Sequence, residues 1–246
     1  MTRRRKPAPY VAPRPDPPVV LPPLPWHRDR IAYPQHTPYN VRQLVEGVLA
    51  GAFVLPTFQR PYVWTDDQVC RLFDSLIRGY HVGSLILWTQ QVQAQTCNLG
   101  GVEVAVKAGR ARIVVDGQQR LGSIARACLS GRFGVDLMSG TMLVEPKPGP
   151  WIVPAPLVVA PMSRDYFERL MTFSPKHVAQ WGLDRDVFDT VVCTMADALS
   201  CVYLSAVELS DAYSQRDVVE MFRRLNKEGT PMSAEDLDRA LTEMER

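Results

Sequence analysis

The sequence has few of the residues that hold catalytic metals. Only four of its 246 residues are histidine, at positions 27, 36, 81 and 177, and none stands in an H-x-x-x-H, H-E-x-x-H or H-N-H spacing. Because such spacings supply the ligands of zinc and other catalytic metals, their absence argues against an autonomous HNH nuclease and against a zinc hydrolase. The five cysteines include no C-x-x-C pair. This argues against a zinc ribbon or a thioredoxin-type site and predicts reduced thiols in a cytoplasmic protein.

Long apolar runs and a large net charge are also missing. No segment approaches the roughly 18 apolar residues of a membrane span, and prolines rather than an apolar region follow the basic start Met1–Lys6. We therefore expect neither a signal peptide nor a membrane anchor. The net charge is only +2, with 46% hydrophobic and 22% charged residues. These values exclude a chain that is disordered throughout and a uniformly basic nucleic-acid coat.

The first part of the chain differs from the rest in charge and in proline content. Residues 1–30 carry seven basic and two acidic side chains, a net charge of +5, so the remainder carries −3. Eleven of the 21 prolines fall at or before Pro38. Proline blocks helix and favours extended backbone. We expect residues 1–37 to form a disordered basic tail, which either contacts a partner or DNA phosphates or is simply solvated.

Apolar periodicity and capping signals divide the rest of the chain into helices and strands. Helices are expected at about 41–50, 66–78, 118–129, 184–199 and 215–225, with others near 163–171 and from 233 onward. Strands are expected at 53–55, 84–89, 102–106, 112–115 and 201–209, and a hairpin at 133–144. The pattern predicts an α/β (α+β) fold that becomes mainly helical after about residue 150.

The segment Asp116-Gly117-Gln118-Gln119-Arg120 carries the clearest chemical signal. It follows the apolar strand 112–115 and leads directly into a helix. Such a turn directs free backbone N–H groups and the positive end of the helix dipole at one place, which favours an anion. Arg120 would grip a phosphate, the two glutamines add neutral donors, and Asp116 would hold a metal or orient a water. The alternative is an ordinary helix start whose arginine pairs with a surface acid.

A second candidate is the loop Leu55–Trp64, which precedes a capped helix. Gln59 and Arg60 are difficult to explain by packing, and Arg60 is suited to a phosphate. Tyr62 or Trp64 could stack on a base. For Trp64 we favour packing, as a hydrophobic staple before the helix N-cap.

For two further segments we favour a structural role over a functional one. The run Phe222–Ser233 contains a helix stop and restart that capping alone explains; the alternative is that Arg224 and Asn226 contact a ligand. Asp136 with Glu145-Pro146-Lys147 has the residue types of an Asp…Glu-x-Lys nuclease core. Pro146 fits poorly in a central strand, which argues against that interpretation.

Four motifs in order carry a resemblance to one family. They are P-x-x-Q-R-x-Y-x-W at 56–64, G-x-x-x-G-S at 79–84, V-D-G-Q-Q-R-L at 115–121 and F-x-R-L-N-x-x-G-x-x-x-S at 222–233. Together they resemble the N-terminal domain family of GmrSD-type modification-dependent restriction systems, which includes the SspE proteins that sense DNA phosphorothioates. The resemblance spans residues 39–238. It implies a ParB/sulfiredoxin-like nucleotide-binding core at 38–148 and a mainly helical extension at 149–246.

The resemblance also implies roles for particular residues. It places an NTP, as substrate or ligand, at Asp116, Gly117, Gln118, Gln119 and Arg120. From the residue types we add Arg60 as a phosphate ligand, and we expect Asp116, Gln119 and Arg120 to be catalytic, with Mg²⁺ held by Asp116. The resemblance implies that Gln59, Arg60, Tyr62 and Trp64 sense DNA. The implied partners are a nucleotide, DNA and an HNH nuclease. This chain supplies no nuclease motif, so we expect a separate nuclease subunit, a longer natural chain, or a regulatory role.

The leading hypothesis is an NTP-binding and NTP-hydrolysing module of an anti-phage restriction system. A second hypothesis is a non-catalytic module that binds a nucleotide or a DNA phosphate at the same turn. A third is a ParB-like DNA nuclease, for which the sequence offers no clear cluster of metal-binding carboxylates.

Overall fold

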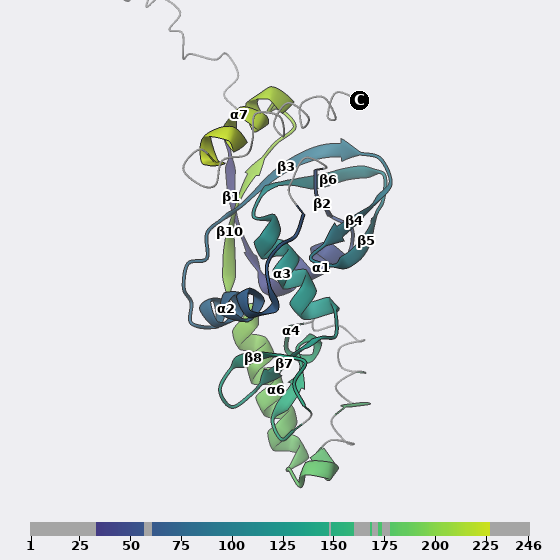
Figure 1. Ribbon diagram of the computed structural model, residues 1–246, viewed down its shortest axis with the longest axis vertical. Helices are drawn as coiled ribbons and strands as arrows, with labels where there is room; N and C mark the ends of the chain where they lie inside the picture. Colours follow the sequence, from purple (N-terminus) through teal and green to yellow (C-terminus); the bar gives the residue numbers. More distant parts are fainter. Residues whose placement is uncertain are drawn as a thin grey trace, which may run out of the picture. The chain divides into compact units, whose positions relative to one another are not determined.

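A five-stranded mixed sheet forms the centre of the described chain in a computed structural model, which describes residues 33–56, 61–147, 149–159, 168, 172–173 and 178–226 (Figure 1). Its strands, in sheet order, are β1 (Gln35–Asn40), β10 (Tyr203–Leu209), β3 (Leu85–Val92), β6 (Gly109–Asp116) and β2 (Phe53–Val54). The β10–β3 and β2–β6 pairs are parallel, and the β1–β10 and β3–β6 pairs are antiparallel. The predicted mixed α/β fold is therefore confirmed.

Three helices contribute to the main hydrophobic core. They are α1 (Val41–Leu49), α2 (Asp66–Ile77) and α3 (Gln118–Leu129). Their apolar sides, represented by Leu44, Phe73 and Leu121, are fully buried in one cluster with Leu87 of β3 and Val114 of β6. The i, i+3, i+4 spacing of these side chains in the sequence is what allows each helix to bury one side.

A second, smaller cluster involves α7 (Gln215–Asn226), whose Val218 and Phe222 pack with Trp88 and Val115. Val115 is adjacent to Val114 in β6, yet the two side chains belong to different clusters. Because successive strand residues point to opposite faces, β6 is buried on both sides. This explains the uninterrupted apolar run before Asp116.

Two smaller sheets complete the described structure. One is the hairpin of β4 (Gln95–Leu99) and β5 (Val102–Val106). The other has the order β8-β7-β9, with β7 (Phe133–Asp136), β8 (Thr141–Val144) and β9 (Ile152–Pro154). The short helix α4 (Pro156–Val159) and the long helix α6 (Arg185–Ser200) follow β9. The predicted hairpin at 133–144 is confirmed by the β7–β8 pairing.

The predicted capping signals are confirmed in detail. The Asn40 side chain accepts from the Gln43 backbone N–H at 2.8 Å, and Thr65 with Gln68 forms a second capping box. Asp184 caps α6 through the Val187 backbone N–H at 3.0 Å. Local side-chain chemistry therefore fixes three helix starts. The helices predicted near 163–171 and from 233 onward lie outside the described residues, as do residues 1–32 of the predicted tail.

Three strands of the structure are missing from the predicted set. Strands β1, β4 and β9 were not predicted, and β1 begins at Gln35, inside the range assigned to the tail. This strand pairs on one side only and most of its side chains are exposed or half-buried, so it shows no apolar alternation. Pro38 is tolerated because an edge strand can lack a ladder donor.

The division at residue 148 stays a prediction, and the five-stranded sheet takes strands from both sides of it. Strand β10, from the segment assigned to a helical extension, lies between β1 and β3. The described residues from Tyr33 onward belong to one compact unit. The sequence pattern identified the β10 segment as β-rich, but its partners are distant in the chain and local patterns do not reveal them. None of the described helices is long and apolar enough to cross a lipid bilayer.

Candidate functional site

The turn between β6 and α3 leaves a helix N-terminus without a side-chain cap. Asp116 ends β6, and Gly117 occupies the N-cap position with φ 95°. No side chain caps this end and the first turn contains no acidic residue. A Cβ at residue 117 would lie 2.4 Å from Leu85 Cδ2, so glycine is required both by conformation and by space. The first backbone N–H groups of α3 therefore keep their hydrogen-bonding capacity.

Arg120 lies in the first turn of α3 and is held by three oxygen atoms. Its Nη2 donates to Asp116 Oδ2 at 2.9 Å, and its Nη1 donates to the backbone carbonyls of Ser84 at 2.7 Å and Val82 at 3.5 Å. The Arg120 side chain is only 16% exposed, against 41% for Asp116. A Cβ on Gly83 would lie 2.6 Å from Arg120 Nη1, so a glycine lets this loop pass the guanidinium. The predicted phosphate ligand is thus an oriented cation with limited freedom.

The neighbouring Gln119 faces a different partner, the loop before α2. Its side chain is 9% exposed. The carboxamide oxygen accepts from the backbone N–H of Val63 at 3.0 Å and of Trp64 at 3.3 Å, and the amide nitrogen donates to the Pro61 carbonyl at 3.3 Å. Gln119 therefore connects the two motifs that the sequence singled out. Its orientation toward loop backbone was not predicted from its residue type.

Tyr62 provides a second connection between this loop and α3. Its hydroxyl lies 2.8 Å from Ser123 Oγ, and burial raises the pKa of the phenol. A Cβ added to Gly122 would lie 2.9 Å from the Tyr62 ring, so the ring lies close against α3. Of the four residues predicted to sense DNA, Tyr62 and Trp64 are thus placed beside the Gln119 anchor. Gln59 and Arg60 lie outside the described residues.

A network of ion pairs lies next to this anchored loop. Asp66, the first residue of α2, accepts from Arg126 Nη2 at 2.8 Å and from Arg132 Nη2 at 3.0 Å. Arg132 also pairs with Glu145 at 2.9 Å, and Arg126 donates to the Gly100 carbonyl at 3.3 Å. The sequence did not predict a role for either arginine, because their shared acidic partner Asp66 is distant along the chain. The network fixes α2 against α3 and β7.

Asp116 is the only carboxylate among the residues predicted for this turn. Within the part of the chain that the structure describes, no group of three or more His, Cys, Asp or Glu side chains is arranged to hold a metal ion. One Asp116 oxygen already accepts from Arg120. Mg²⁺ is commonly held by one or two carboxylates together with substrate phosphates. Asp116 therefore brings a single carboxylate to this turn, and its Oδ2 is already engaged by Arg120.

The two segments for which a structural role was favoured have the following contacts in their described parts. Asp136 accepts from the Met138 N–H and the Ser139 hydroxyl, while Glu145 pairs with Arg132, so each acid has a structural partner. In α7, Glu220 accepts from Arg223 and Arg224. These two hydrogen bonds lower the Glu220 pKa to about 2. Asn226 ends the helix, and residues from 227 onward lie outside the described chain.

Comparison with known families decides what this arrangement belongs to. Residues 41–242 match the model of the GmrSD restriction endonuclease, N-terminal domain. The chain belongs to this family. The GmrSD N-terminal domain is a module of a restriction system, and the match covers both the α3 turn and its anchored loop. This confirms the family resemblance drawn from the four sequence motifs.

A curated relative is similar over part of this GmrSD N-terminal domain. The uncharacterized protein MJ0686 of Methanocaldococcus jannaschii is 30% identical over 107 residues, which is 40% of this chain. The matched region spans 18% of the length of that protein. The similarity supports a shared domain and transfers no activity.

Proposed function

We propose that this GmrSD N-terminal domain binds a nucleoside triphosphate at the start of α3 and hydrolyses it. The observation that carries the proposal is the N-terminus of α3, which has a glycine N-cap, no side-chain cap and an oriented arginine in its first turn. Free N–H groups, the helix dipole and a guanidinium together favour a phosphate chain.

Each residue of the turn has a distinct proposed role. The backbone of Gly117 and Gln118 would approach the phosphates closely, and Arg120 would donate to phosphate oxygens. Asp116 would hold Mg²⁺ together with those oxygens, and the ion would supply charge neutralisation. Occupation of the site would require Asp116 to share or release its bond to Arg120, which at 2.9 Å now neutralises the arginine.

We propose that Gln119 positions the γ-phosphate or the attacking water, and this role carries a structural condition. Among the described residues, the three hydrogen bonds of its side chain go to the Pro61–Trp64 backbone. Its carboxamide must exchange at least one of these bonds to act on substrate. Such an exchange would loosen the loop that bears Tyr62 and Trp64, and so link nucleotide turnover to the segment proposed to sense DNA.

The proposed partners are DNA and a nuclease on another subunit or another part of the natural chain. Membership of a restriction-system family supports both. Contact with DNA is proposed for Gln59, Arg60, Tyr62 and Trp64. Because the Tyr62 hydroxyl bonds to Ser123, only its ring would be offered to a base. A restriction system acts on phage DNA inside the cell. We therefore propose a cytoplasmic location together with this function.

The test compares two arginines of α3 in otherwise intact protein. Arg120→Ala should weaken NTP binding by at least about tenfold, as expected when a charge-assisted hydrogen bond is lost, and should abolish phosphate release. Arg126→Ala is the matched control. It also removes an ion pair to an aspartate and a bond to a backbone carbonyl, and the wild-type side chain is 22% exposed.

The two variants separate loss of function from loss of fold. Calorimetric nucleotide titration and phosphate release are measured alongside thermal unfolding. Equal nucleotide affinity in wild type and Arg120→Ala, with both proteins folded, would overturn the assignment. Equal losses in Arg120→Ala and Arg126→Ala would attribute the effect to stability instead.

A non-catalytic binding module is the second candidate function. The observation in its favour is that Arg120 and Gln119 are both engaged within the protein, and that Asp116 has no companion acid in a metal-binding group among the described residues. Nucleotide binding without phosphate release would support it. Salt-dependent DNA affinity that persists without nucleotide would support a DNA-phosphate ligand. Plasmid nicking lost in Asp116→Ala would instead point to the third hypothesis, a ParB-like nuclease.

A further inference from the structure

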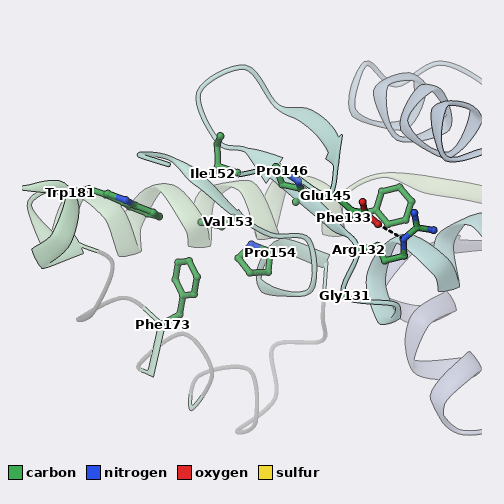
Figure 2. A pocket seen from close by; sticks show the side chains of 11 residues that line it. Gly131, Arg132, Phe133, Glu145, Pro146, Ile152, Val153, Pro154, Phe173 and Trp181 are labelled. Carbon is green, nitrogen blue, oxygen red and sulfur yellow. Dashed lines mark hydrogen bonds and ion pairs between the residues drawn. The ribbon is translucent and has the colours of Figure 1, made fainter. Parts of the chain in front are cut away.

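A cavity of about 290 Å³ lies away from the α3 turn, beside the β8-β7-β9 sheet. Figure 2 shows its two ends. Phe173 and Trp181 stand at one end, Arg132 and Glu145 at the other, and Pro154 lies between them. Its volume is near the lower end of the range for small-molecule sites. The cavity thus combines an aromatic end with a polar end.

The aromatic end is held in place by further ring contacts. Trp181 packs edge-on against Phe173, with centroids 6.5 Å apart and an interplanar angle of 63°. Phe173 in turn stacks on Phe188 at 6.3 Å, and Phe188 is fully buried. Rings fixed in this way present flat apolar surface without a further cost in side-chain entropy. This end is suited to the face of a planar ring.

The polar end offers hydrogen bonds but no uncompensated charge. Arg132 is shared between Glu145 at 2.9 Å and Asp66 at 3.0 Å, and Arg126 also pairs with Asp66. Two arginines therefore balance two carboxylates. An anionic or cationic ligand would find its charge unmatched here, whereas a neutral ligand could accept from Arg132 and donate to Glu145. Glu145 also has φ 44°, a conformation that non-glycine residues rarely adopt.

We propose that this cavity is a second ligand site, specific for an uncharged planar heterocycle of the nucleobase class. A base has two flat faces for the aromatic end and an edge that carries donors and acceptors for the Arg132–Glu145 pair. The site is independent of the phosphate site at α3. Its ligand needs no phosphate, and none of its lining residues belongs to the Asp116–Arg120 turn.

The test is a titration of the full chain with adenosine and with cytidine, followed by NMR shifts or tryptophan fluorescence. Trp181→Leu should weaken binding about tenfold or more, because stacking on an aromatic side chain contributes substantially to base affinity. Glu145→Gln should also weaken it, since the amide changes the acceptor pattern. Glu220→Gln is the matched control, as an acid that pairs with arginines on α7, and should have no effect.

Further measurements test whether the cavity is a nucleobase site separate from the α3 turn. Nucleoside affinity should be unchanged in Arg120→Ala, which separates this site from the proposed phosphate site. If Trp181→Leu fails to fold, Trp181→Phe with Glu145→Gln replaces it. No saturable nucleoside binding, or affinity indifferent to both changes, would overturn the proposal. So would indole binding as tightly as the nucleosides, because that would indicate an apolar void. Competition by a short single-stranded oligonucleotide would identify a base within a strand as the source.

Discussion

Helices α2 and α3 each have 12 residues, but their N-termini differ in how they are capped. In α2 the Thr65 side chain and Gln68 form a capping box, and Asp66 and Asp67 complement the helix dipole. In α3 a glycine occupies the N-cap, no side chain caps the end and the first turn is free of acids. Side chains cap the N-terminus of α2, whereas no side chain caps the N-terminus of α3. This difference supports the proposal that the α3 turn binds an external anion.

The largest expected effect comes from filling the space that the α3 turn requires. Gly117→Ala adds a Cβ 2.4 Å from Leu85 Cδ2 at φ 95°. Backbone strain of about 1–3 kcal/mol and overpacking of about 1–3 kcal/mol should add. Denaturant unfolding measures the loss of stability. Gly79→Ala is the control, because φ is 71° there and nothing lies within 4 Å of the added Cβ. A Gly79→Ala loss as large as that of Gly117→Ala would mean that conformation alone, not close packing, constrains the turn.

The contrast between the two helices was only partly predictable from sequence. The capping box at Thr65 is local, so the sequence located the start of α2 at the correct residue. The strand-to-helix turn at Asp116–Gln118 was predicted for the same reason. Both signals depend on residues within four positions of each other.

The interior arrangement of the site was not predictable in the same way. Gln119 bonds to backbone 55–58 residues away, and the Arg120 guanidinium to carbonyls 36 and 38 residues away. Residue type does not specify such partners. The same holds for β10, whose central place in the sheet depends on pairing with β1 and β3. These partners and the place of β10 depend on pairing between residues far apart in the chain, which local sequence propensity does not encode.

The second prediction compares the glutamines of the two helix starts. Gln119→Leu removes hydrogen bonds to three backbone groups of the Pro61–Trp64 loop. At about 0.5–1.5 kcal/mol for each of the three hydrogen bonds, the free energy of unfolding should fall by about 1.5–4.5 kcal/mol. Gln68→Leu loses the exposed bonds that its Oε1 accepts from the Thr65 backbone N–H and hydroxyl at its own helix start, and should cost less. Chemical unfolding of the two variants gives the comparison, and equal losses would contradict a special anchoring role for Gln119.

The third prediction removes the side-chain N-cap of α2, a feature that α3 lacks. Thr65→Ala should destabilise the protein by about 1 kcal/mol, the usual cost of losing an N-cap side chain. NTP affinity should not change, because the capped end is not the proposed binding end. Thermal unfolding and calorimetric titration of the same sample measure both quantities. A loss of nucleotide affinity beyond the loss of stability would mean that the two helix starts act as one site.

The smallest expected effect tests whether the acids of α2 cancel the field of its N-terminus. A helix N-terminus normally favours a thiolate, yet the pKa of Cys70 is raised by burial and then by Asp67 and Asp66. Asp67→Asn should lower that pKa, increase the thiolate fraction at pH 8 and accelerate alkylation of Cys70 by about twofold, as expected for a screened surface charge. Mass spectrometry of the Cys70 peptide measures the rate, with Asp74→Asn as the control on the same helix. An unchanged rate would mean that burial alone sets the Cys70 pKa, and that the acids of α2 do little to distinguish its N-terminus from that of α3.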